Sequence, residues 1–374
     1  MIFDNPLIPL ALDLASPTPE TRLRAARRLA QQLAVPGFLE TLRGQRLTCL
    51  LYHTLTQFNR EEVGEIPLLE ELRRDYLAGL RGYRNQMREA CSLARELSES
   101  GVEIILLKGA DIRHRLYDDP VCRPMSDLDV LIAPADLEKV RASLEQQGYT
   151  LISRDLDLRP GFTARFGWVV CYQSPGGGLP QVDVHWEIQE AGTFFRLPYP
   201  PLRARAVPLE LHGVPVLVLA PEHLIMHLGL HIFDELEEAY VLKIVDLYLA
   251  LRRFSLDWAL FCEDAARFRL QEPVLWILRE MARWCPDLVP TAVLEELGEH
   301  RPGWAERFIM RRQAGGMLVS SLMALWAHRP LRTWPSYFLA KIWPSSSFLK
   351  ANAHFFAGRK DYLRHIMGRT SRKT

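Results

Sequence analysis

Cysteine is scarce in this chain and is not spaced for metal or disulfide chemistry. Six cysteines occur among the 374 residues, without a CxxC pair or a Cys/His cluster: Cys49, Cys91, Cys122, Cys171, Cys262 and Cys285. This scatter argues against a zinc motif and against a disulfide framework. Few, unpaired cysteines fit a reducing compartment, so we expect a cytoplasmic protein.

Charge of one sign is not in excess either. Lys and Arg total 46 and Asp and Glu total 45, which leaves a formal net charge of +1. A chain without a basic surplus lacks the electrostatic footprint of a nucleic-acid-binding protein. We therefore expect a small molecule, a peptide or a protein as the partner, and not a nucleic acid.

Long uncharged apolar runs are also missing. None reaches the roughly 18 residues that a membrane-spanning helix needs, and the nearest candidate, residues 239–254, is interrupted by Lys243 and Asp246. The apolar N-terminus has no basic residues ahead of it, so we expect neither a signal peptide nor a transmembrane segment. With 48% hydrophobic and 24% charged residues, the composition is that of a soluble globular protein.

The apolar pattern divides the chain into three regions. Residues 1–100 predict helices, because apolar side chains recur at helical spacing in three segments: 16–34, 37–55 and 68–100. Residues 101–192 predict a compact unit of strands and helices. Residues 193–374 predict a C-terminal helical domain that starts with a proline-rich connection and ends in a disordered basic tail: 196–221 and 367–374. The expected fold class is α+β, with a small mixed β-sheet core flanked by N-terminal and C-terminal helical regions.

Within the core, short apolar strands alternate with helices and end in a hairpin. The predicted elements are a strand, a helix, a strand, a helix and two hairpin strands: 102–109, 110–119, 126–133, 134–149, 167–173 and 181–188.

Two aspartates open the second of these strands, in the run "RPMSDLDVLIA". Alternate residues of a strand point to one face, so Asp127 and Asp129 project together. Neighbouring carboxylates repel each other unless a cation lies between them, and oxygen ligands favour a hard divalent ion such as Mg²⁺ or Mn²⁺. The alternative is an exposed strand start at which both carboxylates are simply solvated.

Two other features favour the metal-binding interpretation. Lys108 and Gly109 end the first strand and precede a helix, whose free N–H groups form an anion site. Asp183 and His185 lie on one face of a later strand, where Asp183 can complete a three-carboxylate site and His185 can orient it or contact substrate. Each feature alone has a purely structural explanation, as a turn or as a polar edge-strand residue.

The runs "LLKGADIRHRLYDDPVCRPMSDLDVLI", "LEQQGY", "VDVHWEI" and "VPVLVLAPEHLIMHLGLH" carry a family resemblance. Over roughly residues 95–340 the chain resembles the polymerase-β-type nucleotidyltransferase superfamily, and more narrowly a bacterial group of uncharacterised nucleotidyltransferases. That superfamily combines a strand-end glycine motif, a D-x-D pair and a third acidic residue.

The resemblance implies transfer of a nucleoside monophosphate to a hydroxyl acceptor by a two-metal mechanism, with ATP as the expected donor and pyrophosphate released. Asp127 and Asp129 would hold both ions, while Asp183 would hold the second ion and help to deprotonate the acceptor. Lys108 and Gly109 would receive the phosphates. The usual serine after the glycine is absent here, since Ala110 follows Gly109, so the phosphate contacts differ in detail.

Arg123 and Ser126, just ahead of the aspartate pair, are further candidates for phosphate binding. Arg123 has an equally good structural alternative, a salt bridge with Asp118 or Asp119.

The predicted C-terminal helices carry the remaining candidates. Lys243 either binds the triphosphate or pairs with Asp246 three residues away. His223, His227 and His231 recur every four residues, which favours a polar helix face turned toward the active site; a plain buried or surface stripe is the alternative. His227 and His231, with His185, are the candidates for the acceptor side.

Two other functions stay open. The first is a non-catalytic nucleotide-binding regulatory module on the same fold. The second is a phosphohydrolase or phosphotransferase that acts on the γ-phosphate and yields a nucleoside diphosphate in place of pyrophosphate.

Overall fold

The computed structural model describes most of the chain: residues 2–152, 158–175, 181–189, 194–235, 239–311, 334–351, 353 and 357–366. The predicted disordered tail, 367–374, and most of the predicted hairpin loop, 174–180, lie outside this part.

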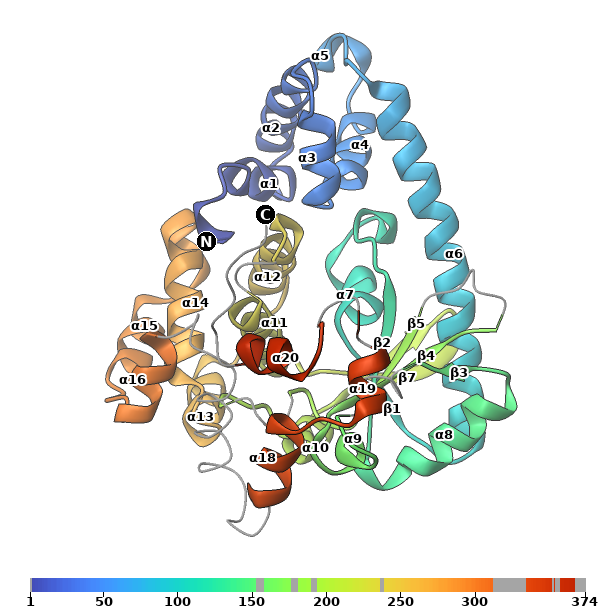
Figure 1. The fold of residues 1–374 in the computed structure, drawn as a ribbon. Helices are drawn as coiled ribbons and strands as arrows, with labels where there is room; N and C mark the ends of the chain where they lie inside the picture. The colour runs from blue at the N-terminus through green and yellow to red at the C-terminus, as the bar shows by residue number, and fades with distance from the viewer. Residues whose placement is uncertain are drawn as a thin grey trace.

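The N-terminal region is helical, as predicted. Its elements are η1 (Ile2–Asp4), α1 (Ile8–Leu14), α2 (Pro19–Gln32), α3 (Phe38–Gly44), α4 (Thr48–Thr56), α5 (Arg60–Val63) and α6 (Leu69–Glu99). Figure 1 shows α1 to α5 gathered at one end of the molecule, with the long helix α6 running from them alongside the sheet. The prediction of one helix over 37–55 was wrong, because Arg46 adopts a left-handed conformation (φ 58°) that separates α3 from α4.

The described strands form one mixed sheet. Its order is β3 (Thr150–Leu151), β4 (Val169–Gln173), β5 (Gln181–His185), β2 (Asp127–Ile132), β1 (Ile104–Leu106), β7 (Val214–Val218) and β6 (Val207–Leu211). The predicted hairpin is confirmed, since β4 and β5 pair antiparallel. The connecting elements are α7 (Lys108–Leu116), η2 (Pro120–Cys122), η3 (Pro134–Asp136), α8 (Leu137–Gln146), α9 (Phe162–Phe166) and α10 (Tyr199–Ala204).

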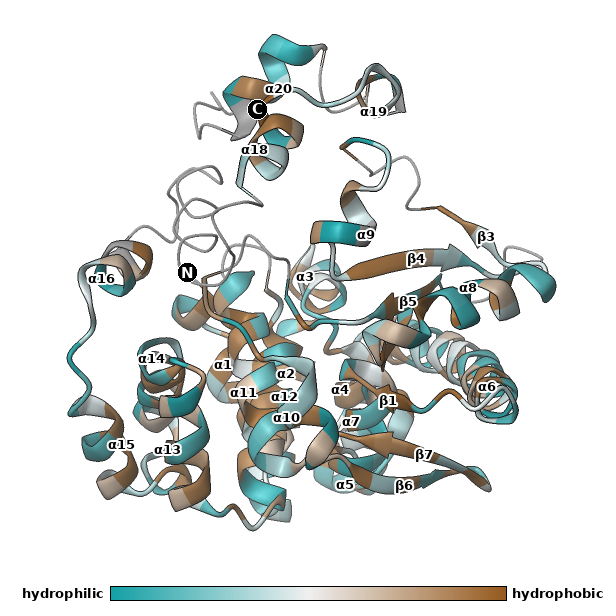
Figure 2. Ribbon diagram, turned by 90° about the horizontal axis from the view of Figure 1, so that it is seen from below, coloured by the Kyte–Doolittle hydropathy of each residue, from teal (hydrophilic) through white to brown (hydrophobic). Residues whose placement is uncertain are grey.

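The two faces of the sheet belong to different cores. Side chains of one face, including Leu128, Val130 and Val184, pack with the apolar stripe of α6 and with α8. In Figure 2 the strands are largely brown, whereas α6 alternates between teal and brown, as an amphipathic helix does. Ile105 and Leu131 point to the opposite face and join the larger core of the N-terminal and C-terminal helices.

The predicted irregular connection was wrong for residues 207–218, which form the β6–β7 hairpin. β7 also pairs parallel with β1, so the sheet continues beyond residue 192.

The C-terminal region is helical, as predicted. Its described elements are α11 (Pro221–Asp234), α12 (Val241–Arg253), α13 (Trp258–Arg267), α14 (Gln271–Trp284), η5 (Pro286–Leu288), α15 (Thr291–Gly298), α16 (Trp304–Arg311), α18 (Trp334–Ile342), α19 (Ser346–Ala351) and α20 (Arg359–Ile366). α11 and α12 lie at the centre of the molecule, and α13 to α16 lie on the side of them that is away from the sheet (Figure 1). Among the described helices, none has the length and apolar character needed to cross a membrane.

Candidate active site

The sheet brings the predicted acidic residues together. β2 and β5 pair in parallel, with Asp129 opposite Asp183 and Asp127 opposite Gln181. Because alternate side chains share a face, both β2 aspartates point to the same side as Asp183 and His185. This is the side of Leu131, which packs toward the helical core.

Asp129 is the most enclosed member of this group, with 2% of its surface exposed. Its Oδ1 lies 2.6 Å from Lys108 Nζ and 2.9 Å from His185 Nε2. Burial alone would raise the pKa of Asp129, but the charge and hydrogen bonds of Lys108 and His185 hold it well below the usual value. Asp129 is therefore a buried carboxylate that stays ionised.

The other two carboxylates are less enclosed. Ser126 Oγ donates to Asp127 Oδ1 over 3.3 Å, and Gln181 Nε2 donates to Asp183 Oδ1 over 2.7 Å. Burial and the neighbouring Asp129 raise the pKa of Asp127. One oxygen each of Asp129 and Asp183 and one ring nitrogen of His185 lie within 4.8 Å of one another, so these three can hold a metal ion. The sequence suggested that His185 orients Asp183. In the structure His185 hydrogen-bonds Asp129 instead.

Lys108 and Gly109 are the first residues of α7, two positions after the end of β1 at Leu106, whereas the sequence placed them at the end of the strand and ahead of the helix. The helix begins at Lys108, which adopts a left-handed conformation (φ 46°) that is uncommon for a residue with a side chain. This turn directs Lys108 toward Asp129. Gly109 is required for a different reason, because a Cβ atom there would lie 2.8 Å from Cβ of Met125, next to the aspartate strand.

We expect Gly109→Ala to destabilise the protein by about 1–3 kcal/mol, since the added methyl group overpacks the contact with Met125. The matched control is Gly82→Ala in α6, where a Cβ atom meets nothing within 4 Å; it should stabilise the helix by about 0.5–1 kcal/mol. Urea denaturation measures both. Equal effects of the two changes would contradict the assigned role of Gly109.

Arg123 does not contact the acidic group and does not pair with Asp118 or Asp119. Its guanidinium is buried, and Nε donates to both carboxylate oxygens of Asp246 at 2.9 and 2.8 Å. The predicted phosphate role is therefore not supported for Arg123. Lys243 does not form the pair with Asp246 that the structural alternative predicted. It forms an ion pair with Glu235, and its ammonium lies 5.0 Å from the ring centre of Tyr240.

A cavity of about 360 Å³ adjoins Lys108 and is lined by Lys108, Trp168, Ile188, Gln189, His227, His231, Asp234 and Glu235. Two of the three predicted histidines therefore face a cavity beside the acidic group. His223 does not line this cavity, and its Nε2 lies 3.0 Å from Asp264.

Five residues that line the cavity were not predicted from the sequence, and one of them is the apolar Ile188. Trp168 packs on His185 with ring centres 5.1 Å apart. Gln189, Asp234 and Glu235 complete the wall. A signal existed for the acidic pair, because positions 234 and 235 follow His231 by three and four residues and so share its helix face.

His227 is the unusual residue of the cavity. It is 3% exposed, it stacks on His231 with ring centres 6.3 Å apart, and neither ring nitrogen hydrogen-bonds another described residue. Burial, followed by the charge of Lys108, lowers its pKa from the ordinary 6.5 to about 3. His227 is therefore neutral near pH 7 and offers unused hydrogen-bonding capacity to a ligand.

This lowered pKa makes stability depend on pH. Below about pH 6.5 the unfolded chain binds a proton at His227, while the folded chain stays unprotonated there down to about pH 3. The contribution of neutral His227 to the free energy of unfolding is therefore complete above pH 6.5 and is lost as the pH falls. At pH 5 the loss is about 2 kcal/mol. Urea denaturation gives the free energy of unfolding at pH 7 and pH 5. The decrease between the two pH values should be smaller by this amount in His227→Gln than in the unaltered protein. The same loss in both would contradict the assignment.

Comparisons with known proteins were made against this geometry. Residues 32–286 match the model of a family described as "Uncharacterised nucleotidyltransferase". No curated protein matches. The chain is similar to an antigenic nucleotidyltransferase-like protein from Paracoccidioides brasiliensis, whose crystal structure aligns over 56% of this chain and 93% of that chain, with 16% identity and a TM-score of 0.35. The match to the family model covers well over half of the sequence and confirms the expected family: the chain belongs to this group of uncharacterised nucleotidyltransferases.

Proposed function

We propose that this protein transfers a nucleoside monophosphate, with ATP as the expected donor, to a hydroxyl group on a small-molecule, peptide or protein acceptor, and releases pyrophosphate. The observation that supports this most is the pairing of β2 with β5, which places Asp129 opposite Asp183 beside the N-terminus of α7. Carboxylates at this position meet the requirement of the reaction for divalent cations close to a phosphate-binding helix end.

The donor set fits Mg²⁺ or Mn²⁺. Asp127, Asp129 and Asp183 supply hard carboxylate oxygens. Burial, followed by the charge of Asp129, raises the pKa of Asp127. Without a cation, Lys108 neutralises Asp129. Divalent ions, when bound, would supply the positive charge that stabilises the entering and leaving oxygens.

The residues of the chain have separate tasks in this proposal. Asp127 and Asp129 would hold both ions. Asp183, which is only partly buried, would hold the second ion and help to take the proton of the acceptor hydroxyl. Lys108, displaced from Asp129, can turn to the triphosphate next to the N–H groups that follow Gly109. Ser126 lies exposed at the start of β2, where its hydroxyl can reach a phosphate oxygen.

Lys243 and the cavity complete the proposed site. Lys243 is close enough to Lys108 for its pKa to be lowered by that charge, after the larger effect of burial. We assign it to the triphosphate, which would draw it from Glu235. His227 and His231, with His185 nearby, are assigned to the acceptor, because their cavity adjoins Lys108 and the ring nitrogens of His227 hydrogen-bond no residue in the described part of the chain.

Mass spectrometry of candidate acceptors incubated with Mg²⁺ and ATP, CTP, GTP or UTP tests this function. A mass gain of one nucleotidyl group identifies donor and acceptor together. A gain of one phosphoryl group, with a nucleoside diphosphate formed, would indicate γ-phosphate transfer in its place.

One observation favours a second function, a nucleotide-binding module without turnover: Asp129 already has two close partners, Lys108 and His185. The enzyme and the binding module are distinguished by measuring nucleotide binding and pyrophosphate release in the unaltered protein and in the double variant Asp127→Ala/Asp129→Ala. Binding by both forms with pyrophosphate from neither favours the module, whereas release by the unaltered protein alone favours the enzyme.

A further inference from the structure

A second group of metal-ligating side chains lies apart from the acidic site. His53 comes from α4, and Asp119 and Cys122 come from the η2 turn that leads toward β2. One ligand atom from each lies within 4.8 Å of the other two. The positions of His53, Asp119 and Cys122 have no recognisable metal-ligand spacing in the sequence, which therefore predicts no zinc motif. The fold brings the three side chains together.

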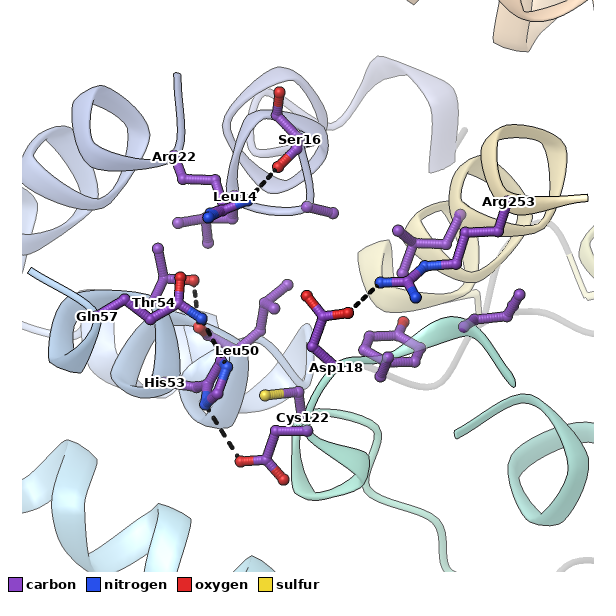
Figure 3. A pocket seen from close by; sticks show the side chains of 15 residues that line it. Leu14, Ser16, Arg22, Leu50, His53, Thr54, Gln57, Asp118, Cys122 and Arg253 are labelled. Atoms are coloured by element: carbon purple, nitrogen blue, oxygen red, sulfur yellow. Dashed lines mark hydrogen bonds and ion pairs between the residues drawn. The ribbon is translucent and has the colours of Figure 1, made fainter. Parts of the chain in front are cut away.

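The three side chains converge at one wall of a pocket, shown in Figure 3. The sulfur of Cys122 points toward the imidazole of His53, and a dashed line joins that ring to a carboxylate. The carboxylate belongs to Asp119, whose Oδ2 lies 3.2 Å from His53 Nδ1. Cys122 is almost fully buried, and its thiol makes a long contact of 3.8 Å to the carbonyl oxygen of Cys49.

Asp119 and His53 are held in place by other groups. Tyr76 of α6 donates its hydroxyl to Asp119 Oδ2, and the N–H of Val121 donates to Oδ1. His53 Nε2 lies 2.8 Å from Gln57 Nε2, which fixes the ring from its other side. Partners of this kind orient ligands in metal sites.

The adjoining space can complete a coordination shell. A cavity of about 50 Å³ is lined by Cys122, His53 and Asp119 together with Leu50, Thr54 and Tyr117. This volume exceeds the roughly 10–15 Å³ that a water molecule needs. One water is enough to add a fourth ligand to three protein atoms.

We propose that His53, Asp119 and Cys122 bind a borderline-soft divalent transition metal such as Zn²⁺, with a water molecule as the fourth ligand. One nitrogen, one oxygen and one sulfur ligand suit Zn²⁺ and disfavour Mg²⁺. On binding, the Cys122 S–H bond is replaced by a sulfur–metal bond and the proton passes to solvent. His53 Nδ1 exchanges Asp119 for the metal, and its proton moves to Nε2, which then donates to Oε1 of Gln57 after the amide of Gln57 has turned over.

The position of this site gives it a structural role. It ties α4 of the N-terminal helical region to the turn that ends five residues before Asp127. A metal there stabilises the docking of that region on the sheet. This site is independent of the proposed nucleotidyl transfer, and either can fail alone.

The proposal is tested by titrating the metal-free full chain with Zn²⁺. Excess Mg²⁺ is present, so that Mg²⁺ and not Zn²⁺ occupies the acidic site. We expect one Zn²⁺ per chain and a higher melting temperature. Cys122→Ser should weaken Zn²⁺ binding at least about 100-fold and abolish the thermal shift, and His53→Ala should act in the same direction. Cys49→Ser, which changes the neighbouring thiol, should leave binding unchanged. Co²⁺ should give a thiolate charge-transfer band in the unaltered protein and in Cys49→Ser, but not in Cys122→Ser.

Two results would overturn the proposal. One is the absence of Zn²⁺ binding by the unaltered chain in excess Mg²⁺. The other is Zn²⁺ binding and a Co²⁺ band in Cys122→Ser equal to those of the unaltered protein. Circular dichroism of each variant establishes that it is folded, and Cys122→Ser changes only one atom of the side chain.

Discussion

Asp183→Asn should reduce pyrophosphate release by at least about 10³-fold, equivalent to about 4 kcal/mol of transition-state stabilisation, with little change in stability. Asparagine keeps the size of the side chain and can keep the hydrogen bond to Gln181, but it removes the charge that holds a cation. Asp183 is only partly buried, so the free energy of unfolding should change by less than about 0.5 kcal/mol. Steady-state assays and urea denaturation measure the two quantities.

Asp129→Asn gives the contrasting result. It should reduce activity to the same extent and also destabilise the fold by about 3–5 kcal/mol, because the pair loses its buried carboxylate and the half-buried ammonium of Lys108 loses its partner. Asp136→Asn is the matched control, since Asp136 follows the same strand but pairs with the exposed Lys139; activity should be unchanged. An Asp183→Asn variant with full activity would contradict the assignment of Asp183 to the metal site.

The second large effect concerns the buried pair of Arg123 and Asp246, which are 6% and 1% exposed. Arg123→Leu should destabilise the protein by about 3–5 kcal/mol, since among the described residues Asp246 then keeps only Tyr117 as a close hydrogen-bond partner. Urea denaturation measures the loss. In the double variant Arg123→Leu/Asp246→Leu, part of the stability should return, because both charges leave the core together.

The control for this pair is Arg253→Leu, which breaks the exposed ion pair with Asp118 and should change stability by less than about 1 kcal/mol. An unchanged stability of Arg123→Leu with a raised KM for nucleotide would contradict the structural role. That result would favour the phosphate-binding role of Arg123 that the sequence predicts.

The arrangement of the acidic group could be predicted because it depends on local rules. The alternation of side chains along a strand places Asp127 and Asp129 on one face, and the same rule places Asp183 and His185 together on β5. The actual partners of these residues, Lys108 on Asp129 and Gln181 on Asp183, depend on side-chain conformations that no spacing specifies.

The β6–β7 hairpin shows why part of the fold was missed. Its apolar residues alternate as in a strand, but Pro208 and Pro215 suggested an irregular connection. The structure accommodates both, since β6 is an edge strand and β1 pairs only with the end of β7, beyond Pro215. The two-residue turn, His212 and Gly213 with φ of 49° and 79°, is typical of a tight hairpin.

Contacts between distant segments were beyond prediction for a simpler reason. Arg123 and Asp246 are separated by 123 positions, and their pairing depends on how α12 packs against the segment before β2. The grouping of His53 with Cys122 depends in the same way on the docking of α4.

The most direct measurement is ³¹P NMR of ATP incubated with the protein, Mg²⁺ and the acceptor identified by mass spectrometry. We predict pyrophosphate in equal amount to nucleotidylated acceptor, with none formed when Mg²⁺ is chelated or when Asp183 is replaced by Asn. Inorganic phosphate with ADP, or pyrophosphate formed at the same rate without a divalent cation, would contradict a nucleotidyl transfer that depends on metal ions held by Asp127, Asp129 and Asp183.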